Sequence, residues 1–383
     1  MTPDLPQIWL CPDRLFDGKT LLDGCALGVH LGRTTRIRAQ SDLPADARRL
    51  SLPGTLAPGF LDLQVNGGGD AFLNATPSAA AMATMAAAHR RFGTVAILPT
   101  VITDAHEVLA AAVEAALAAK GQPGILGLHI EGPHLSLIRR GTHSAQWVRP
   151  FEPATMTHVN RLRAAGIFVK ITVAPEAMSL GQIAALVATG AVVSVGHSDA
   201  TAEATRAALA EGASCFTHLF NAMSPMQNRA AGVTGACINS TAYAGIICDG
   251  HHVADEMVGL AIRARPVPDR MFLVSDSMST VGGSDRFTLY GQEVRLIGGR
   301  LVNSEGSLAG AHVTMAEGVQ RLISVVGVPA EQALKMAIST PAHLVRQPAM
   351  ASPEARDLAD LILLDNQWQV TAMGADLARG QAA

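Results

Sequence analysis

The sequence predicts a (β/α)₈ barrel of the TIM type, together with a small β-sandwich domain formed from both chain ends. Three observations support this prediction. Short apolar runs alternate with Ala-rich helical stretches after Ala57, eight such runs occur, and strand-like pieces remain at both ends of the chain. Alternation of strands with helices indicates a parallel sheet, and eight units suit a closed barrel better than an open doubly wound sheet.

The eight predicted strands are rich in Val, Ile and Leu and do not alternate cleanly with polar residues. Such runs are typical of parallel strands that are buried on both faces. No GxGxxG turn follows the first run, and no GxxxxGK[ST] loop occurs, which argues against an open nucleotide-binding sheet. The predicted strands are 60–66, 94–100, 125–131, 168–174, 192–197, 214–218, 245–249 and 271–276.

Good helix formers fill most of the intervals between these strands. Several of the helical stretches open at Asp, Ser or Thr, as expected of N-caps. The clearest predicted helices are 78–91, 104–119, 154–165 and 200–211. We therefore expect the barrel to occupy residues 57–349.

The two ends of the chain carry shorter strand signals. Residues 1–56 contain β-like pieces at 7–10 and 26–31, and the segment 357–370 is strand-like after helical stretches at 313–326 and 331–345. We expect residues 1–56 and 350–383 to form the small β domain together.

Composition narrows the class of protein. The chain has 383 residues, of which 49% are hydrophobic and 16% charged, as in a globular protein with a large core. A net charge of −3 gives no electrostatic reason to expect nucleic acid or an anionic membrane as a partner. Five widely spaced cysteines without a CxxC pair, and no evident signal peptide, predict a reducing cytoplasm.

Ionisable residues finish four of the apolar runs. "GLHIEGPHL" ends its run at Glu131, and His197, His218 and Asp276 finish the fifth, sixth and eighth runs. The carboxyl ends of the strands form the catalytic face of such a barrel. One Glu and two His are a sufficient protein ligand set for a catalytic divalent metal with an open position for water, and Asp276 is then placed to act as general base and acid.

Each of these residues also has an ordinary interpretation. A single His at a strand end is commonly hydrogen-bonded and structural, and a single Asp or Glu there commonly caps the next helix. The occurrence of all four at equivalent ends of a repeated pattern favours metal-dependent hydrolysis. His134 and His129 are interpreted as supporting residues near this site.

Motifs along nearly the whole chain resemble the N-acetylglucosamine-6-phosphate deacetylases of the amidohydrolase superfamily. They are "LAPGFLDLQVNG", "LHIEGPHLSLIRRGTHS", "GHSDAT", "THLFNAM", "DGHHV", "VSDSMS", "GSLAGAHVTMAEGV" and "DLADLILLD", in the order and spacing of that family. The resemblance implies hydrolysis of the acetamide of N-acetylglucosamine 6-phosphate to glucosamine 6-phosphate and acetate, a step of amino-sugar catabolism.

The same resemblance implies a role for individual residues. It implies that Glu131, His197 and His218 hold one divalent metal per subunit. This metal is expected to be Zn²⁺, with Fe²⁺, Co²⁺ or Mn²⁺ as alternatives. The resemblance also implies that Asp276 is the catalytic acid and base and that His143 helps to polarise the acetamide carbonyl. The residues implied to bind the phosphosugar are Thr142, His143, Asn221, Ala222, Arg229, His252, Leu308, Ala309 and Gly310.

Two of these assignments carry further expectations. Arg229 is expected to reach across from a neighbouring subunit, which implies a homodimer with shared sites. His252 falls three residues after Asp249, as the family pattern requires, and the adjacent His251 is the alternative phosphate contact.

The first strand departs from the pattern of many amidohydrolases. Those enzymes carry His-x-His at its end and bind two metals, whereas this chain has Gln64-Val65-Asn66. Gln and Asn are poor zinc ligands, so a second tightly bound metal is not expected.

Other functions remain open on the sequence. A dihydroorotase-like or aminoacylase-like amidohydrolase would use the same barrel on a different N-acyl or cyclic amide substrate, but it would not need the "THLFNAM" and "DGHHV" phosphate elements. A catalytically silent subunit or a phosphosugar sensor without turnover is also compatible with the fold. Such proteins usually lose a ligand or the catalytic Asp, and here all four residues are present.

Overall fold

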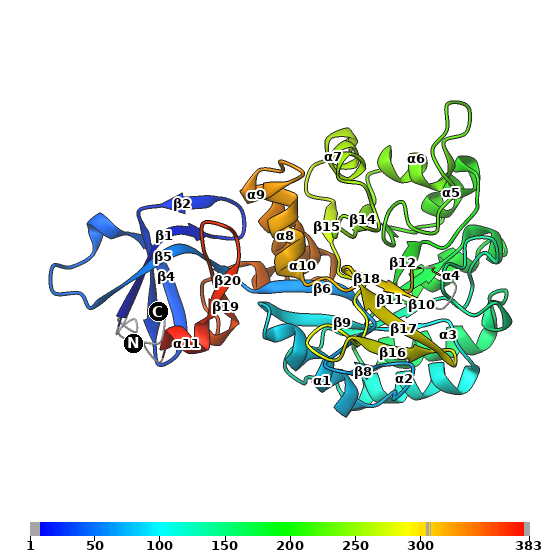
Figure 1. The fold of residues 1–383 in the computed structure, drawn as a ribbon, viewed down its shortest axis with the longest axis horizontal. Coiled ribbons are helices and arrows are strands. Elements are labelled where there is room, and N and C mark those ends of the chain that lie inside the picture. Colours follow the sequence, from blue (N-terminus) through cyan, green and yellow to red (C-terminus); the bar gives the residue numbers. More distant parts are fainter. Residues whose placement is uncertain (1–7, 304–305, 307, 379–383) are drawn as a thin grey trace.

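Eight parallel strands form the barrel that the sequence predicts, and a second sheet forms a small domain beside it (Figure 1). The computed structural model describes residues 8–303, 306 and 308–378. The barrel strands follow the chain in order around the sheet. They are β6 (Phe60–Val65), β9 (Thr94–Ile102), β10 (Gly127–Glu131), β11 (Phe168–Val173), β12 (Val192–Val195), β13 (Cys215–Phe216), β14 (Tyr243–Ile246) and β15 (Met271–Leu273).

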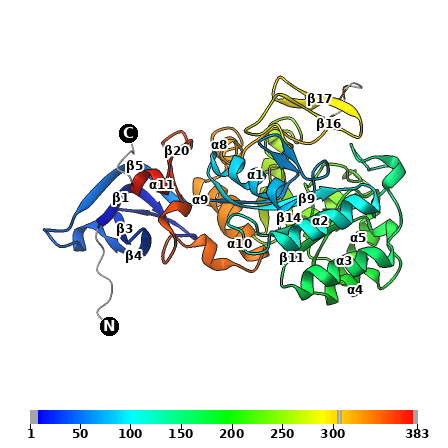
Figure 2. The same ribbon diagram turned by 90° about the horizontal axis from the view of Figure 1, so that it is seen from below.

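Helices connect successive strands and cover the outside of the barrel (Figure 2). The helices are α1 (Ala79–Arg90), α2 (His106–Ala118), α3 (Pro153–Ala164), α4 (Gln182–Ala188), α5 (Ala202–Ala210), α6 (Gly232–Ile238), α7 (Asp255–Ala264), α8 (Met315–Ser324), α9 (Ala330–Leu334) and α10 (Thr340–Leu344), with a π-helical segment at Lys335–Ser339 between the last two.

The barrel closes between its first and last strands through the segment that follows β15. The backbone N–H of Asp276 donates to the carbonyl of Gln64 at 3.0 Å, and the N–H of Asn66 donates to the carbonyl of Ser277 at 2.9 Å. A parallel bridge between Val65 and Ser277 completes the contact. Residues that are 211 or 212 positions apart in the sequence are therefore fixed in register at the mouth of the barrel.

The small domain contains strands from both chain ends. Its seven-stranded sheet has β5 next to the N-terminal strand β1 and the C-terminal strand β19, which confirms the predicted β domain. Gln7, expected to begin its first strand, and residues 379–383 lie outside the described residues. The strands are β1 (Ile8–Phe16), β2 (Leu21–Asp23), β3 (Cys25–His30), β4 (Arg33–Ala39), β5 (Arg49–Pro58), β19 (Leu361–Leu364) and β20 (Val370–Met373), followed by the short helix α11 (Gly374–Ala378).

Two small sheets are added at the carboxyl ends of the barrel strands. One is the pair β7 (Gly67–Gly68) and β8 (Ala71–Phe72), and the other consists of β16 (Arg286–Leu289), β17 (Gln292–Ile297) and β18 (Arg300–Val302). Their apolar side chains share one buried cluster with Ile102 and Met278, so the three-stranded sheet packs at the mouth of the barrel.

The strands at the site are shorter than the sequence predicts. The expectation that His197, His218 and Asp276 finish their strands was wrong, because β12, β13 and β15 end two or three residues earlier. All three residues have positive φ angles, of 48°, 31° and 53°. A left-handed residue turns its backbone out of the ladder, and this conformation costs a side-chain-bearing residue about 1–2 kcal/mol.

No helix in the described part of the chain is long and apolar enough to cross a membrane. All five cysteines are free thiols.

Candidate active site

Glu131, His197 and His218 bring three ligand atoms into one buried triangle. Oε1 of Glu131 lies 3.0 Å from Nε2 of His218 and 3.3 Å from Nε2 of His197, and the two Nε2 atoms are 3.0 Å apart. A tetrahedral zinc ion with bonds of about 2.0 Å separates its ligand atoms by about 3.3 Å. The triangle therefore has the dimensions of three ligands around a single small cation.

The hydrogen bonds of His197 favour the tautomer that binds a metal. Its Nδ1 lies 3.0 Å from the carbonyl oxygen of Arg139, which can only accept, so Nδ1 carries the proton and the lone pair of Nε2 points into the triangle. Burial would raise the pKa of Glu131, but the adjacent imidazoles of His197 and His218 hold it well below its usual value. The carboxylate is therefore charged, and the donor set fits a divalent cation.

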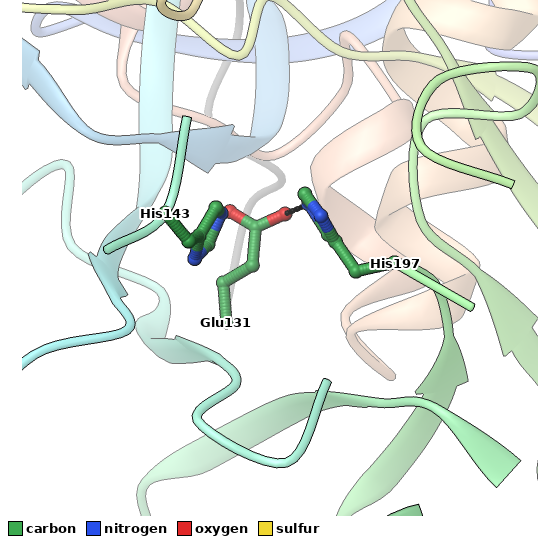
Figure 3. A group of neighbouring side chains, drawn as sticks. All are labelled: Glu131, His143 and His197. Atoms are coloured by element: carbon green, nitrogen blue, oxygen red, sulfur yellow. Dashed lines mark hydrogen bonds and ion pairs between the residues drawn. The ribbon is translucent and has the colours of Figure 1, made fainter. Parts of the chain in front are cut away.

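His143 lies on the other side of the same carboxylate. Figure 3 shows the rings of His143 and His197 flanking Glu131, and ligand atoms of these three residues lie within 4.8 Å of one another. His143 is thus an alternative third ligand to His218. We favour His218, because its Nε2 is within 3.0 Å of both other ligand atoms, whereas Nδ1 of His143 accepts the backbone N–H of Thr103 at 3.4 Å.

The charge and tautomer of His143 follow from its surroundings. Burial, followed by the charge of His197, lowers its pKa to about 3, so the imidazole is neutral. Because Nδ1 accepts a hydrogen bond, Nε2 carries the proton. A neutral ring with a free N–H can donate to a carbonyl oxygen in the cavity.

Asp276 is held by two side-chain amides. Its Oδ1 accepts hydrogen bonds from Nε2 of Gln64 at 3.0 Å and from Nδ2 of Asn66 at 2.8 Å. Burial and the charge of Glu131 raise its pKa, which makes the carboxylate a stronger base than an exposed Asp.

Most of the predicted site residues line one cavity of about 170 Å³. Its walls include Glu131, Thr142, His143, His197, His218, Asn221, Ala222, His252, Asp276, Leu308 and Gly310. Two predicted residues are not in the wall. The side chain of Ala309 is buried in the apolar cluster under the three-stranded sheet, and its expected sugar contact stays a prediction. Arg229 is exposed outside the cavity of its own chain.

The structure separates the two adjacent histidines of "DGHHV". Nδ1 of His252 lies 2.6 Å from Oδ2 of Asp249, and the His252 ring faces the reaction cavity, whereas His251 is exposed and lines a different cavity. Burial would raise the pKa of Asp249, but the hydrogen bond and charge of His252 and two backbone N–H groups hold it at about 2. The carboxylate orients the His252 ring, and Nε2 has no hydrogen-bond partner among the residues that the structure describes.

The sequence did not reveal what Gln64 and Asn66 do. In the sequence they are only poor replacements for metal ligands, because their proximity to Asp276 depends on the closure of the barrel. The supporting interpretation of the other histidines agrees with their contacts. His129 forms hydrogen bonds with the hydroxyl groups of Thr100 and Thr172 below Glu131. His134 forms hydrogen bonds with the carbonyls of Arg149 and Pro150 and with the hydroxyl of Thr155.

The amidohydrolase family model matches residues 55–379. A relative from Shewanella sp. (strain ANA-3), described as N-acetylgalactosamine-6-phosphate deacetylase, is 38% identical over 92% of this chain and 91% of its own. The N-acetylglucosamine-6-phosphate deacetylase of Haemophilus influenzae is 32% identical over 86% of this chain and 88% of its own.

Solved structures of similar proteins agree with these sequence comparisons. The N-acetylglucosamine-6-phosphate deacetylase of Pasteurella multocida superimposes with a TM-score of 0.88 at 33% identity, over 96% of this chain and 98% of that chain. A mutant of the Mycobacterium smegmatis enzyme, in complex with N-acetyl-D-glucosamine-6-phosphate, superimposes with a TM-score of 0.86 at 31% identity, over 96% of this chain and 97% of that chain.

Proposed function

This chain belongs to the amidohydrolase family, and we propose that it hydrolyses the acetamide of N-acetylglucosamine 6-phosphate to glucosamine 6-phosphate and acetate. The observation that carries the proposal is the single cavity in which a ligand triangle, a basic Asp and a neutral His face one another. Relatives and solved structures with that activity in their names cover most of the chain.

Glu131, His197 and His218 would hold one divalent metal per subunit, and we propose Zn²⁺, with Fe²⁺, Co²⁺ or Mn²⁺ as alternatives. One carboxylate and two imidazoles are ligands that zinc accepts while leaving a position open. A bound divalent ion supplies two kinds of help, a lowered pKa for water and polarisation of a carbonyl oxygen. Because Gln64 and Asn66 turn their N–H groups toward the carboxylates, they offer no second ligand set.

Asp276 performs both proton transfers. No hydrogen bond reaches its Oδ2 from the residues that the structure describes, while Oδ1 is taken by Gln64 and Asn66. Oδ2 accepts a proton from the water whose oxygen bonds to the carbonyl carbon, and later delivers that proton to the amide nitrogen. The C–N bond then breaks, the sugar amine is the leaving group, and the acyl group with the water oxygen becomes acetate. A carboxylate with a raised pKa suits both halves of this cycle.

His143 stabilises the negative charge that develops on the carbonyl oxygen. Its Nε2–H donates without a net charge of its own, and its position beside His197, with ring centroids 4.4 Å apart, is fixed by packing. At the other end of the cavity His252, Asn221 and Ala222 would receive the phosphate, and Leu308 and Gly310 would close over the sugar.

Arg229 would complete the phosphate site from a neighbouring subunit of a homodimer. Its exposure, and its absence from the cavity of its own chain, agree with this role. A cytoplasmic location is part of the same proposal, and five unpaired thiols are compatible with a reducing compartment.

N-acetylgalactosamine 6-phosphate is a second candidate substrate. The Shewanella relative named for that sugar is more similar to this chain, at 38% identity, than the Haemophilus relative named for the gluco epimer, at 32%. The two sugars differ in the orientation of one hydroxyl group, and both carry the acetamide and the phosphate that the cavity would bind.

The test measures the release of acetate from three sugars by protein of known metal content. The sugars are N-acetylglucosamine 6-phosphate, N-acetylgalactosamine 6-phosphate and unphosphorylated N-acetylglucosamine. We expect kcat/KM for a phosphorylated sugar to exceed that for the unphosphorylated one by about 10²-fold or more, since a site built for a polar group rejects an analogue that lacks it. A higher value for the galacto sugar would select the second candidate. If no acetate is released from either phosphorylated sugar, the proposal is contradicted.

A further inference from the structure

The side chains of Gln64 and Asn66 meet the two acidic residues of the site in an unusual arrangement. Nε2 of Gln64 lies 3.0 Å from Oε1 of Glu131 and also 3.0 Å from Oδ1 of Asp276. Nδ2 of Asn66 lies 2.8 Å from the same Oδ1 and 3.3 Å from the Asp276 backbone carbonyl. Two neutral amides therefore converge on one carboxylate oxygen.

We infer that Gln64 and Asn66 are positioning residues for the proton transfer: together they fix Oδ1 of Asp276, and Gln64 ties it to Glu131, so that Oδ2 alone faces the scissile amide. The inference rests on the proposed function, because it assigns the orientation of the acid and base in that same site.

The backbone around these residues holds the arrangement in register. The hydrogen bonds of Gln64 and Asn66 with Asp276 and Ser277 join strand β6 to the segment after β15. Below them Oδ1 of Asp62 accepts the N–H groups of Gln64 and Ser275, each at 3.2 Å. Both amides are at most 1% exposed, so water does not compete for their donors.

The orientation of the amides is also determined by charge. Oε1 of Gln64 and Oδ1 of Asn66 are buried and have no hydrogen-bond partner in the described part of the chain. Turning either amide by 180° would place an oxygen against a carboxylate oxygen, which repels it. Leaving two acceptors unpaired is thus the consequence of aiming both NH₂ groups at the carboxylates.

A neutral bridge has a further effect on the pair of acids. Glu131 and Asp276 are two carboxylates joined by the same Gln64 amide, and their like charges repel each other. An NH₂ group has two hydrogens, so Gln64 can donate one to each carboxylate. A charged residue at position 64 would favour one acid or repel both, whereas the amide holds the metal ligand and the base at a fixed separation.

The test uses variants that keep the side-chain volume and remove the donors, Asn66→Leu and Gln64→Met. The matched control is Asn74→Leu, because Asn74 is also buried and bonds Ile102 and Asp104 without contacting Asp276. For each protein kcat, KM, metal content and thermal unfolding are measured on the N-acetylhexosamine phosphate that the wild type hydrolyses.

We expect Asn66→Leu to lower kcat by about 10²-fold, the scale for a displaced catalytic group, with KM within about twofold of wild type and metal content unchanged. Asn74→Leu should lower the unfolding temperature and leave kcat unchanged. Because both amides act on one oxygen, the double variant should lose less than the product of the single losses.

A kcat within twofold of wild type for both single variants would overturn the inference, and so would a loss of activity that follows a loss of bound metal. A KM that rises while kcat is kept would overturn it as well, since the amides would then serve substrate binding. Failure of the proposed function is distinct from these results, because it would appear as an inactive wild type.

Discussion

His143 and Asp276 face the same cavity, and burial shifts their pKa values in opposite directions. Burial lowers the pKa of His143 to about 3 and raises that of Asp276. An imidazole that resists protonation can donate its N–H at neutral pH, while a carboxylate with a raised pKa accepts a proton more readily. One physical cause thus produces a neutral donor and a basic acceptor in the same space.

Single residues were predictable from the sequence where they interrupt an apolar run. Glu131 and Asp276 stand out because a charge at the end of a buried strand needs a partner. The tautomers of His143 and His197 were not predictable, because they depend on Thr103 and Arg139, which belong to other segments. The role of Gln64 and Asn66 was likewise hidden, since an amide in a sequence does not show where its NH₂ group points.

A pH dependence of stability is expected from His134. Burial lowers its pKa from 6.5 to about 4, so the unfolded state binds the proton more readily between these two values. The contribution of His134 to stability is therefore constant well above pH 6.5 and decreases as the pH falls toward 4. Between pH 7.5 and pH 5 this residue alone should remove about 2 kcal/mol of the free energy of unfolding.

The measurement is urea unfolding at both pH values for the wild type and His134→Gln. The loss of stability on going to pH 5 should be smaller in the variant by about the 2 kcal/mol assigned to His134. His251→Gln is the control, because His251 is exposed and lines a cavity distant in sequence from His134, and the loss of stability in this variant should match that of the wild type. Equal losses in all three proteins would show that His134 is not responsible.

Secondary-structure elements were predicted best where local chemistry defines their ends. The predicted helix at 78–91 begins as expected because the Ser78 side chain accepts the N–H of Ala81. The predicted helix at 331–345 is instead divided by the π-helical segment Lys335–Ser339. Pro341, at the start of α10, lies just after this segment and has no backbone N–H with which to continue a regular α-helix.

The strand ends at the site show why element boundaries escaped prediction. A His or Asp after an apolar run reads as the last residue of a strand, yet His197, His218 and Asp276 lie in left-handed turns beyond β12, β13 and β15. Gly132, after Glu131, has a φ of +84°, and a Cβ there would lie 2.1 Å from Oγ1 of Thr103. Position 132 thus requires a glycine.

The order of the barrel strands could be predicted for the whole molecule, because parallel strands joined by helices follow one another around the sheet. The pairing inside the small domain could not. β5 lies parallel to β1 and antiparallel to β19, and strand signals at both ends of a sequence do not specify that arrangement. The proposed limits of the domains, at 56/57 and 349/350, stay predictions, and β5 itself runs to Pro58.

Shared active sites would make two inactive variants complement each other. Arg229→Ala removes the proposed phosphate contact, and Asp276→Asn removes the base. If Arg229 acts on its partner, a heterodimer has one complete site, so an equimolar mixture after subunit exchange should recover about one quarter of wild-type activity by random pairing.

The measurement is acetate release before and after mixing, with sedimentation analysis of the same samples. A monomer of 39.8 kDa, or a dimer whose mixture gains no activity, would contradict the shared site. Each variant alone at twice the concentration is the control, since it contains the same total protein without heterodimers.

The most direct measurement compares acetate release from N-acetylglucosamine 6-phosphate by the wild type and by Asp276→Asn, with the metal of both proteins quantified. We expect about one divalent ion per chain in each protein, rapid release by the wild type, and a kcat lowered by about 10²–10⁴-fold in the variant. A metal-loaded wild type that releases no acetate, or a variant that keeps full activity, would contradict the assignment of Asp276 as acid and base of a metal-dependent deacetylase.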